Sequence, residues 1–287
     1  MFDPAQLAAL AHVHRRGSFD HAAADLHVTP SAISQRIKAL EEAAGALLIR
    51  RGQPCTATDT GLRLVRHHEE TALLNKSLAE DLLARTEPAV LRIAINADSL
   101  ATWVIPALAE TQGFLYDILI DDQDFSQGLL KSGEVAAAIT SHPGPLQGCD
   151  TAPLGRLHYR ATASPAYVAR WFPNGITADA LTKAPALRFN DKDRLQAQWA
   201  ARQTGHPLPL PSHRLASSHG FVDACLCGLG WGMNPDALVA RHLASGDLVD
   251  LSPDNPLEIQ LYWQFNRLTA RAIAPLTAAL QRAAKSL

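Results

Sequence analysis

The sequence is poor in cysteine, in long apolar runs and in net charge, and each shortage argues against a class of protein. Only Cys225 and Cys227 of its four cysteines are close together, so neither a disulfide framework nor a zinc site of two cysteine pairs is indicated. No apolar run reaches the roughly 18 residues that a membrane span needs. The N-terminal stretch MFDPAQLAAL lacks the basic start of a secretory signal. Together these features predict a folded cytoplasmic protein.

The net charge of the chain does not by itself favour binding to nucleic acid. The formal net charge is −2, and within the first sixty residues six cationic side chains are balanced by six acidic ones. The cations are Arg15, Arg16, Arg36, Lys38, Arg50 and Arg51, and the acids are Asp3, Asp20, Asp25, Glu41, Glu42 and Asp59. Any DNA contact must therefore depend on which face the cations occupy, and we expect moderate non-specific affinity that falls with salt.

The segment PAQLAALAHVHRRGSFDHAAADLHVTPSAISQRIKALEEAAG carries three helical patterns in succession. Gly17 ends the first helix, and Ser18 is a natural N-cap for the second. The link HVT is only a few residues long, after which Thr29 and Pro30 suit the cap and first turn of the third helix. Two short helices joined by so tight a turn are typical of a helix-turn-helix.

The third helix has an apolar face and a polar face. Its inward positions are Ile33, Ile37 and Leu40, and its polar positions are Ser31, Ser34, Gln35 and Lys38. The N-terminal residues of such a helix meet base edges in the major groove, and glutamine pairs most typically with adenine. The alternative is a small helical bundle with a solvated face. Small side chains at the helix start favour DNA binding, because they permit close approach.

The next segment, ALLIRRGQPCTATDTG, is predicted to form a wing. It has the pattern of a short strand, a turn at Arg50-Arg51-Gly52 and a second strand that ends near Thr58. The two arginines could reach a phosphate or the minor groove.

The stretch GSFDHAAADLHVTPSAISQRIKALEEAAGALLIRR resembles the winged helix-turn-helix of LysR-type transcriptional regulators, and the resemblance extends over essentially the whole chain. In that family the third helix supplies the base contacts. The resemblance implies base contacts for Pro30, Ser31, Ser34 and Gln35, and backbone contacts for Thr29, Arg36 and Lys38. Residues 1–58 would form this DNA-binding domain.

Residues 59–87 are predicted to form a connecting helix, ended by Glu87-Pro88. Its apolar stripe is imperfect, because Glu69 and Lys76 interrupt it, and a regular coiled coil would have a cleaner seam. An exposed helix of this length usually needs a partner. The resemblance implies an antiparallel dimer helix, and we expect a homodimer that assembles further into a homotetramer. The alternative is a helix packed on its own chain.

Residues 88–287 alternate between strand and helix patterns, which predicts an α/β fold with largely parallel strands. The expected strands are 90–96, 115–122, 135–140, 159–164, 184–190, 213–218, 231–235 and 258–265. The expected helices are 99–110, 125–134, 165–172, 194–204, 219–227 and 269–287. This number of units predicts two lobes, with chain crossings near residues 160 and 264. Lobe I would hold 88–160 and 265–287, and lobe II 161–264. The resemblance implies a regulatory domain like the periplasmic binding proteins.

Ligands of open α/β lobes lie beyond the carboxyl ends of strands. Polar and acidic residues gather at these junctions, and the candidates are Asn96, Asp98, Ser99, Thr102, Asp122, Thr140, Asn190, Ser217 and Ser218. Helix N-termini attract an anion and carboxylates attract a cation, which together suit a basic amino acid. Each residue also has a purely structural interpretation. Ser99 could simply cap a helix, and Asp193 could be a solvated loop acid.

The motifs IAINADSLATW, GLLKSGEVAAAIT, GLGWGM and LYWQ resemble the branch of the family that responds to lysine or arginine. Those regulators activate genes for basic amino-acid exporters, and their Asn-Ala-Asp-Ser segment contributes to the effector site. One position departs, because His219 stands where the branch commonly has an acid.

The sequence gives little support to an enzyme. It has no dinucleotide fingerprint, phosphate loop or nucleophile elbow, and its histidines lack metal-ligand spacing, so we expect no catalytic residue, no metal and no cofactor. A periplasmic solute-binding protein would explain the lobes but not the head. An architectural or origin-binding DNA protein would leave the acid-lined junctions unused. A LysR-type regulator with a different small metabolite as effector remains the other alternative.

Overall fold

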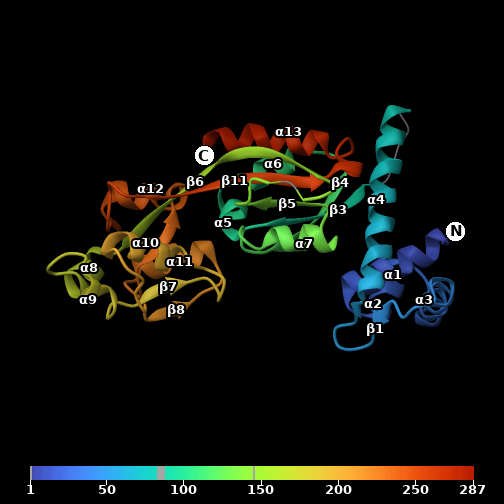
Figure 1. Ribbon diagram of the computed structural model, residues 1–287, viewed down its shortest axis with the longest axis horizontal. Coiled ribbons are helices and arrows are strands. Elements are labelled where there is room, and N and C mark those ends of the chain that lie inside the picture. Colours follow the sequence, from blue (N-terminus) through green and yellow to red (C-terminus); the bar gives the residue numbers. More distant parts are fainter. Residues whose placement is uncertain (1, 83–87, 145) are drawn as a thin grey trace.

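The computed structural model describes residues 2–82, 88–144 and 146–287, which form a head, a long helix and an elongated α/β body (Figure 1). The head contains α1 (Pro4–Arg16), α2 (Phe19–Asp25), α3 (Pro30–Ala44) and a hairpin of β1 (Ile49–Arg50) and β2 (Thr56–Ala57). Its predicted caps are confirmed: Ser18 Oγ accepts from His21 N at 3.4 Å, and Thr29 Oγ1 from Ala32 N at 3.2 Å. Leu10, Ile33 and Leu40 are fully buried between the helices.

Helix α4 (Asp59–Asp81) runs from the head along one end of the body (Figure 1). One side of α4 packs on its own chain, as the alternative interpretation held. There Leu73 joins the main body core, and the Lys76 ammonium lies 4.5 Å from the centre of the Phe114 ring. The other side leaves three leucines exposed, Leu74, Leu78 and Leu82. The expected last turns, residues 83–87, lie outside the described residues.

The body is built on a seven-stranded sheet of order β10-β6-β11-β5-β3-β4, in which β9 also pairs with β6. The strands are β3 (Ala89–Ile95), β4 (Phe114–Ile120), β5 (Ala137–Thr140), β6 (Cys149–Ala163), β9 (Gly232–Pro235), β10 (Val249–Asp250) and β11 (Leu257–Asn266). A smaller parallel pair joins β7 (Ala186–Arg188) to β8 (Ser212–Arg214). We call the part built on β3, β4 and β5 lobe I, and the part built on β7 to β10 lobe II.

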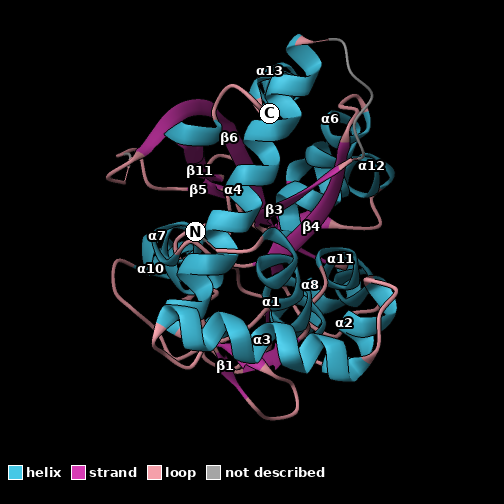
Figure 2. Cartoon of the chain, turned by 90° about the vertical axis from the view of Figure 1, so that its right-hand side faces the viewer, coloured by secondary structure: helices cyan, strands magenta, loops and turns pink. Residues whose placement is uncertain are grey.

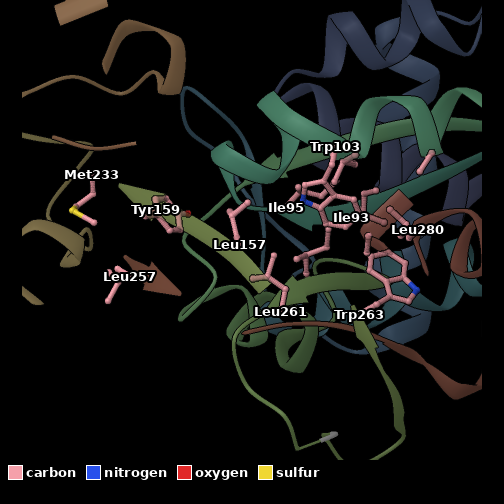
Figure 3. Close-up of a cluster of buried hydrophobic side chains, with 14 of the residues drawn as sticks. Ile93, Ile95, Trp103, Leu157, Tyr159, Met233, Leu257, Leu261, Trp263 and Leu280 are labelled. Atoms are coloured by element: carbon pink, nitrogen blue, oxygen red, sulfur yellow. The ribbon is translucent and has the colours of Figure 1, made fainter. Parts of the chain in front are cut away.

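The expectation of largely parallel strands is wrong for the centre of this sheet. Strand β3 is parallel to β4 and β5, but β11 is antiparallel to both β5 and β6, and β6 is antiparallel to β9 and β10. The reason is the double crossing between the lobes. Strand β6 leaves lobe I and β11 returns to it, so the two crossing strands run in opposite directions side by side. Figure 3 shows their buried residues, from Trp263 and Leu261 to Tyr159 and Leu257, extending between the lobes.

Helices cover both lobes (Figure 1). Lobe I carries α5 (Ala97–Ser99), a π-helical turn (Leu100–Val104), α6 (Ile105–Ala109), α7 (Ser126–Ser132), a 3-10 turn (Arg267–Thr269), α13 (Ala274–Ala283) and a final 3-10 turn (Ala284–Ser286). Lobe II carries α8 (Pro165–Trp171), α9 (Ala178–Leu181), α10 (Leu195–Thr204), α11 (Ser218–Leu226) and α12 (Asp236–Ser245). Within the described ranges, no helix combines the length and apolarity needed to cross a lipid bilayer.

Several predicted elements differ from the structure. The strand expected at 159–164 is the longer β6, and the expected elements do not include α9, α12 or β10. The helix expected at 99–110 starts at Ala97 and contains the π-helical turn, whose C-terminal side leads into Pro106, a residue that has no N–H to continue the helical ladder. The helix expected at 269–287 is regular only over Ala274–Ala283. The strand expected at 213–218 ends at Arg214, because Ser217 instead caps α11.

Candidate functional sites

Most of the polar face of α3 is exposed rather than packed on the head core. Ser31, Gln35 and Lys38 are exposed at the spacing i, i+4, i+7, whereas Ile33 and Ile37 point into the core. Thr29 and Pro30 are exposed at the helix start, where Thr29 Oγ1 lies 2.9 Å from Ser31 Oγ, and Ser34 and Arg36 are half-buried beside them. A helix with this face can enter a major groove N-terminus first.

The hairpin beside α3 has the form of the predicted wing. Ile49 pairs with Ala57 and Arg50 with Thr56, so Arg50 ends the first strand rather than starting the turn. Arg51 is exposed and its guanidinium lies 5.5 Å from the centre of the Phe19 ring. Figure 2 shows α3 and the β1 hairpin at the same end of the molecule.

The head cations are sorted between two faces. Arg15 is 3.3 Å from Glu69 and 3.9 Å from Asp117, and Arg16 is 3.0 Å from Asp25, so acids partner both side chains. The other four cations of residues 1–60 are on α3 and the wing, where Lys38 is also 3.8 Å from Glu42 in an exposed ion pair. They are Arg36, Lys38, Arg50 and Arg51. A head with no net charge therefore still presents cations where DNA would lie.

A second site is a pocket between the two lobes, with a volume of about 600 Å³ counted with its open mouth. Lobe I lines it with Asn96, Ala97, Asp98, Ile120, Asp121, Asp122 and Gln123. Lobe II lines it with Phe189, Asn190, Asp193, Leu195, Gln196, Ser218, Phe221, Met233 and Asn234.

Asp98 connects the lobes at the pocket wall. Ser218 Oγ of lobe II donates to Asp98 Oδ1 at 2.6 Å, and the Tyr159 hydroxyl of the crossing strand β6 donates to Oδ2 at 2.8 Å. Burial raises the pKa of Asp98, against the effect of these two hydrogen bonds, and no cation pairs with the carboxylate among the described residues. A buried carboxylate of this kind is stabilised when a positively charged group binds beside it.

Neighbouring polar groups of the pocket are also wholly or partly buried, and two of them are carboxyl groups. Burial, helped by the charges of Asp124, Asp193 and Asp121, raises the pKa of Asp122 to about 6. Burial also raises the pKa of Asp193, which accepts from Phe189 N at 2.8 Å and Leu195 N at 3.1 Å. The interpretation of Asp193 as a solvated loop acid is therefore wrong. The Asn96 amide is buried and has no hydrogen-bond partner among the described residues.

Five of the nine predicted effector residues line this pocket, namely Asn96, Asp98, Asp122, Asn190 and Ser218. The other four lie outside the lining. Ser99 is buried and precedes the π-helical turn, but its side chain makes no capping hydrogen bond. Thr102 Oγ1 donates to the Asp98 carbonyl at 2.6 Å, and Ser217 accepts from Gly220 N at 3.0 Å.

Thr140 is the remaining residue outside the lining, and its hydroxyl donates to the Gln123 carbonyl at 2.9 Å. It therefore positions Gln123, which does line the pocket, as do the apolar rings of Phe189 and Phe221. Sequence reasoning did not identify Phe189, Phe221, Gln196 or Tyr159 as effector residues. His219 is exposed and also lies outside the lining.

Both sites match one protein family. Residues 4–62 match the profile of the bacterial regulatory helix-turn-helix protein, lysR family, and residues 84–285 match the LysR substrate binding domain. The chain belongs to the LysR family. Its members are DNA-binding transcriptional regulators with a small-molecule effector and are not enzymes.

Relatives narrow the placement within the LysR family. The chain is 41% identical to the HTH-type transcriptional regulator LysG of Mycobacterium tuberculosis, over 99% of this chain and 94% of that protein. It is 39% identical to the regulator ArgP of Pseudomonas fluorescens, over 98% of this chain and 97% of that protein. This LysR protein is therefore a regulator of the LysG and ArgP kind.

Solved structures agree with this placement. A crystal structure of ArgP from Mycobacterium tuberculosis matches with a TM-score of 0.82 at 41% identity, covering 100% of this chain and 98% of that one. A full-length LysG from Corynebacterium glutamicum, described with bound effector Arg, matches with a TM-score of 0.69 at 35% identity and covers 99% of this chain and 98% of that one. The predicted fold class is confirmed: a helix-turn-helix head and linker helix precede an α/β effector domain.

Proposed function

We propose that this LysR regulator is switched by lysine or arginine and controls genes for basic amino-acid export. The main support for this proposal is that Asp98 is a carboxylate buried in the inter-lobe pocket without a cationic partner among the described residues. Asp122 and Asp193 add further carboxylates to the same lining. The LysG of Corynebacterium glutamicum, described with bound effector Arg, supports the proposal by similarity.

The pocket suits a basic amino acid at both of its ends. Its carboxylates attract ammonium or guanidinium groups, and the Phe189 and Phe221 rings, 6.5 Å apart, offer an apolar wall for a methylene chain. The amide of Asn96, which lacks a partner among the described residues, is available to the effector carboxylate. The N-terminal end of α11 also favours an anion, although Ser217 Oγ already accepts from one backbone N–H there. A neutral metabolite, the competing proposal, would leave Asp98 without a cationic partner among the described residues.

The direct test is a thermal-shift screen of the purified full chain against the common amino acids. A ligand that binds only the folded state raises the melting temperature by mass action. Lysine or arginine should give the largest rise. The proposed effector class is wrong if a neutral or acidic amino acid raises the melting temperature while both basic ones leave it unchanged.

The affinity for lysine is expected to fall as the pH is lowered from 7.5 to 5.5. Because the pKa of Asp122 is about 6, its carboxylate is mostly ionised at pH 7.5 and mostly protonated at pH 5.5. A cationic ligand needs the ionised form, so its affinity should drop by about fourfold over that interval from this group alone. Calorimetric titration at both pH values measures the change. Asp122→Asn should lose the component centred near pH 6, and an unaltered profile in that variant would rule this assignment out.

We propose the following organisation of the chain. Residues 1–58 form the DNA-binding domain, 59–87 the linker helix, and 88–287 the effector domain, with lobe I as 88–160 and 265–287 and lobe II as 161–264. Two heads would read a pseudo-palindromic promoter site in the cytoplasm, placed by a homodimer that assembles into a homotetramer. Differential affinity of the effector for two arrangements of the heads would supply the switch.

The linker helix carries the dimer part of this proposal. Leu74, Leu78 and Leu82 recur every four residues on the side of α4 that faces away from the body core, with exposed fractions of 47%, 58% and 71%. A leucine row of this kind is what a partner helix would bury. Leu78→Glu should shift the mass in sedimentation equilibrium toward the monomer, whereas Leu229→Glu, on lobe II, should not. Equal masses for wild type and Leu78→Glu would exclude this face as the dimer contact.

A further inference from the structure

One lysine of lobe II reaches a carboxylate of lobe I that lines the pocket. Lys192 follows β7 in lobe II, and its ammonium is 2.5 Å from Asp121 Oδ1 at the end of β4 in lobe I. The same ammonium lies 4.8 Å from the centre of the Phe125 ring, also in lobe I. A carboxylate with an aromatic ring face is a recognised combination for holding an organic cation.

This cation position adjoins the effector pocket. Asp121 lines the pocket, and its side chain is only 15% exposed, whereas Lys192 and Phe125 lie outside the lining. Asn96, which follows the neighbouring strand β3, is 3% exposed, lines the same pocket and has both side-chain polar atoms without a partner among the described residues. The pocket therefore contains a buried polar group without a partner among the described residues, and one of its lining carboxylates, Asp121, is already paired with a lysine.

The loop that carries Lys192 is held in place from within lobe II. Asn190 Oδ1 accepts from Lys192 N at 2.7 Å and from Asp193 N at 3.1 Å. The Asp191 carboxylate is 2.6 Å from the Arg214 guanidinium. The contact of Lys192 with Asp121 thus joins a loop of lobe II to the end of a strand in lobe I.

We propose that Asp121 and Phe125 form the subsite for the side-chain cation of the effector, and that Lys192 occupies it as a tethered substitute in the ligand-free chain. This inference rests on the proposed function for the identity of the ligand. The class of ligand is an amino acid that ends in a primary ammonium or a guanidinium. Its carboxylate end points inward to Asn96 and the start of α11, and its cationic end displaces Lys192 from Asp121.

Lys192 then sets the affinity of the pocket as an internal competitor. A ligand that meets a subsite occupied most of the time binds more weakly in proportion to the free fraction. Lys192→Gln keeps a polar side chain and removes the cation, so the affinity for lysine and arginine should rise by about five- to tenfold if the subsite is free in a tenth to a fifth of the molecules. Norleucine, which lacks the terminal ammonium, should gain nothing. Lys183→Gln, which removes the partner of Asp179 at 2.8 Å on the surface of lobe II, is the matched control.

Calorimetric titration of wild type, Lys192→Gln, Lys183→Gln and Asp121→Asn with these ligands tests the proposal. Asp121→Asn should weaken lysine and arginine but not norleucine. If Lys192→Gln weakens lysine, arginine and norleucine alike, Lys192 holds the effector carboxylate and the proposal is wrong. An unchanged affinity for lysine in Lys192→Gln also overturns it.

A second measurement needs no ligand and separates this inference from the proposed function. Spin labels are placed on exposed Cys227 in lobe II and on a cysteine from Gln112→Cys in lobe I, in a Cys55→Ser background that leaves the buried Cys149 and Cys225. Lys192→Gln should broaden the distance distribution between the labels and lengthen its mean in the ligand-free chain. An identical distribution overturns the tethered contact, whereas a wild type that binds no basic amino acid overturns the proposed effector instead.

Discussion

Gln35→Ala is expected to weaken binding to the operator by roughly 5- to 150-fold, the range that corresponds to about 1–3 kcal/mol for a lost bidentate base contact. Gln35 is exposed on the first half of α3, one turn after Ser31, and its neighbours Ile33 and Ile37 anchor the helix in the head core. Its amide can both donate and accept, which is what a base edge requires. Ser34→Ala, at the half-buried neighbouring position, should show a smaller loss in the same direction.

Selection from random DNA first yields the preferred sequence, and fluorescence anisotropy then measures affinity for it and for a scrambled duplex. Lys38→Ala is the control, because a phosphate contact should be lost on both duplexes and should reduce the dependence on salt. A loss in Gln35→Ala that is equal on both duplexes would mean that Gln35 does not read bases. The outcome therefore separates base recognition from backbone contact at positions one turn apart.

The head could be predicted closely because its signals are local. Thr29 and Pro30 mark the start of α3, and the apolar positions Ile33, Ile37 and Leu40 leave one polar face for DNA. The wing differs only in detail, since Arg50 ends β1 instead of starting the turn. Capping and helical periodicity act within a few residues, so the sequence alone is sufficient for them.

The pocket could be predicted only in part because it forms between lobes. Asn96, Asp98, Asp122 and Asn190 were found by their place at or just after strand ends. Tyr159 lies within β6, and its contact with Asp98 depends on the crossing of two strands that are far apart in sequence. Pro153 and Gly155 also interrupt the apolar pattern of β6, so the sequence predicts a strand only from residue 159 and misses the first part of β6.

Thr102 and Thr140 are predicted effector residues that do not line the pocket. Both stand at the expected strand-to-helix junctions, but their hydroxyls donate to backbone carbonyls. Thr102 supports the Asp98 carbonyl and Thr140 the Gln123 carbonyl. Position after a strand identifies the right edge of the sheet but not the direction of each side chain. That direction follows from tertiary contacts such as the hydrogen bond between Ser218 and Asp98.

Asp98→Asn is expected to remove most of the affinity for a basic amino acid while leaving the ligand-free protein at least as stable. Removing one partner of a buried charge pair costs about 2–5 kcal/mol, which is roughly 30-fold or more in affinity. The free energy of unfolding of the ligand-free variant should instead be equal to or higher than that of the wild type. Burial raises the pKa of Asp98, so folding disfavours the charged form, and at neutral pH a carboxylate with a raised pKa destabilises the fold. Asparagine has no charge to desolvate.

The hydrogen bonds of Asp98 allow this exchange. Tyr159 and Ser218 both donate hydroxyl protons to the carboxylate, and a hydroxyl can turn to accept from the amide nitrogen that replaces one oxygen. Melting curves with and without lysine measure both effects, with Asp254→Asn on an exposed loop as the control for a lost surface acid. A variant that melts lower without ligand and still shows the wild-type rise with lysine would assign Asp98 to the fold rather than to the effector. The expected pattern, a stable protein that no longer responds, would mean that this buried charge is kept for binding at the expense of stability.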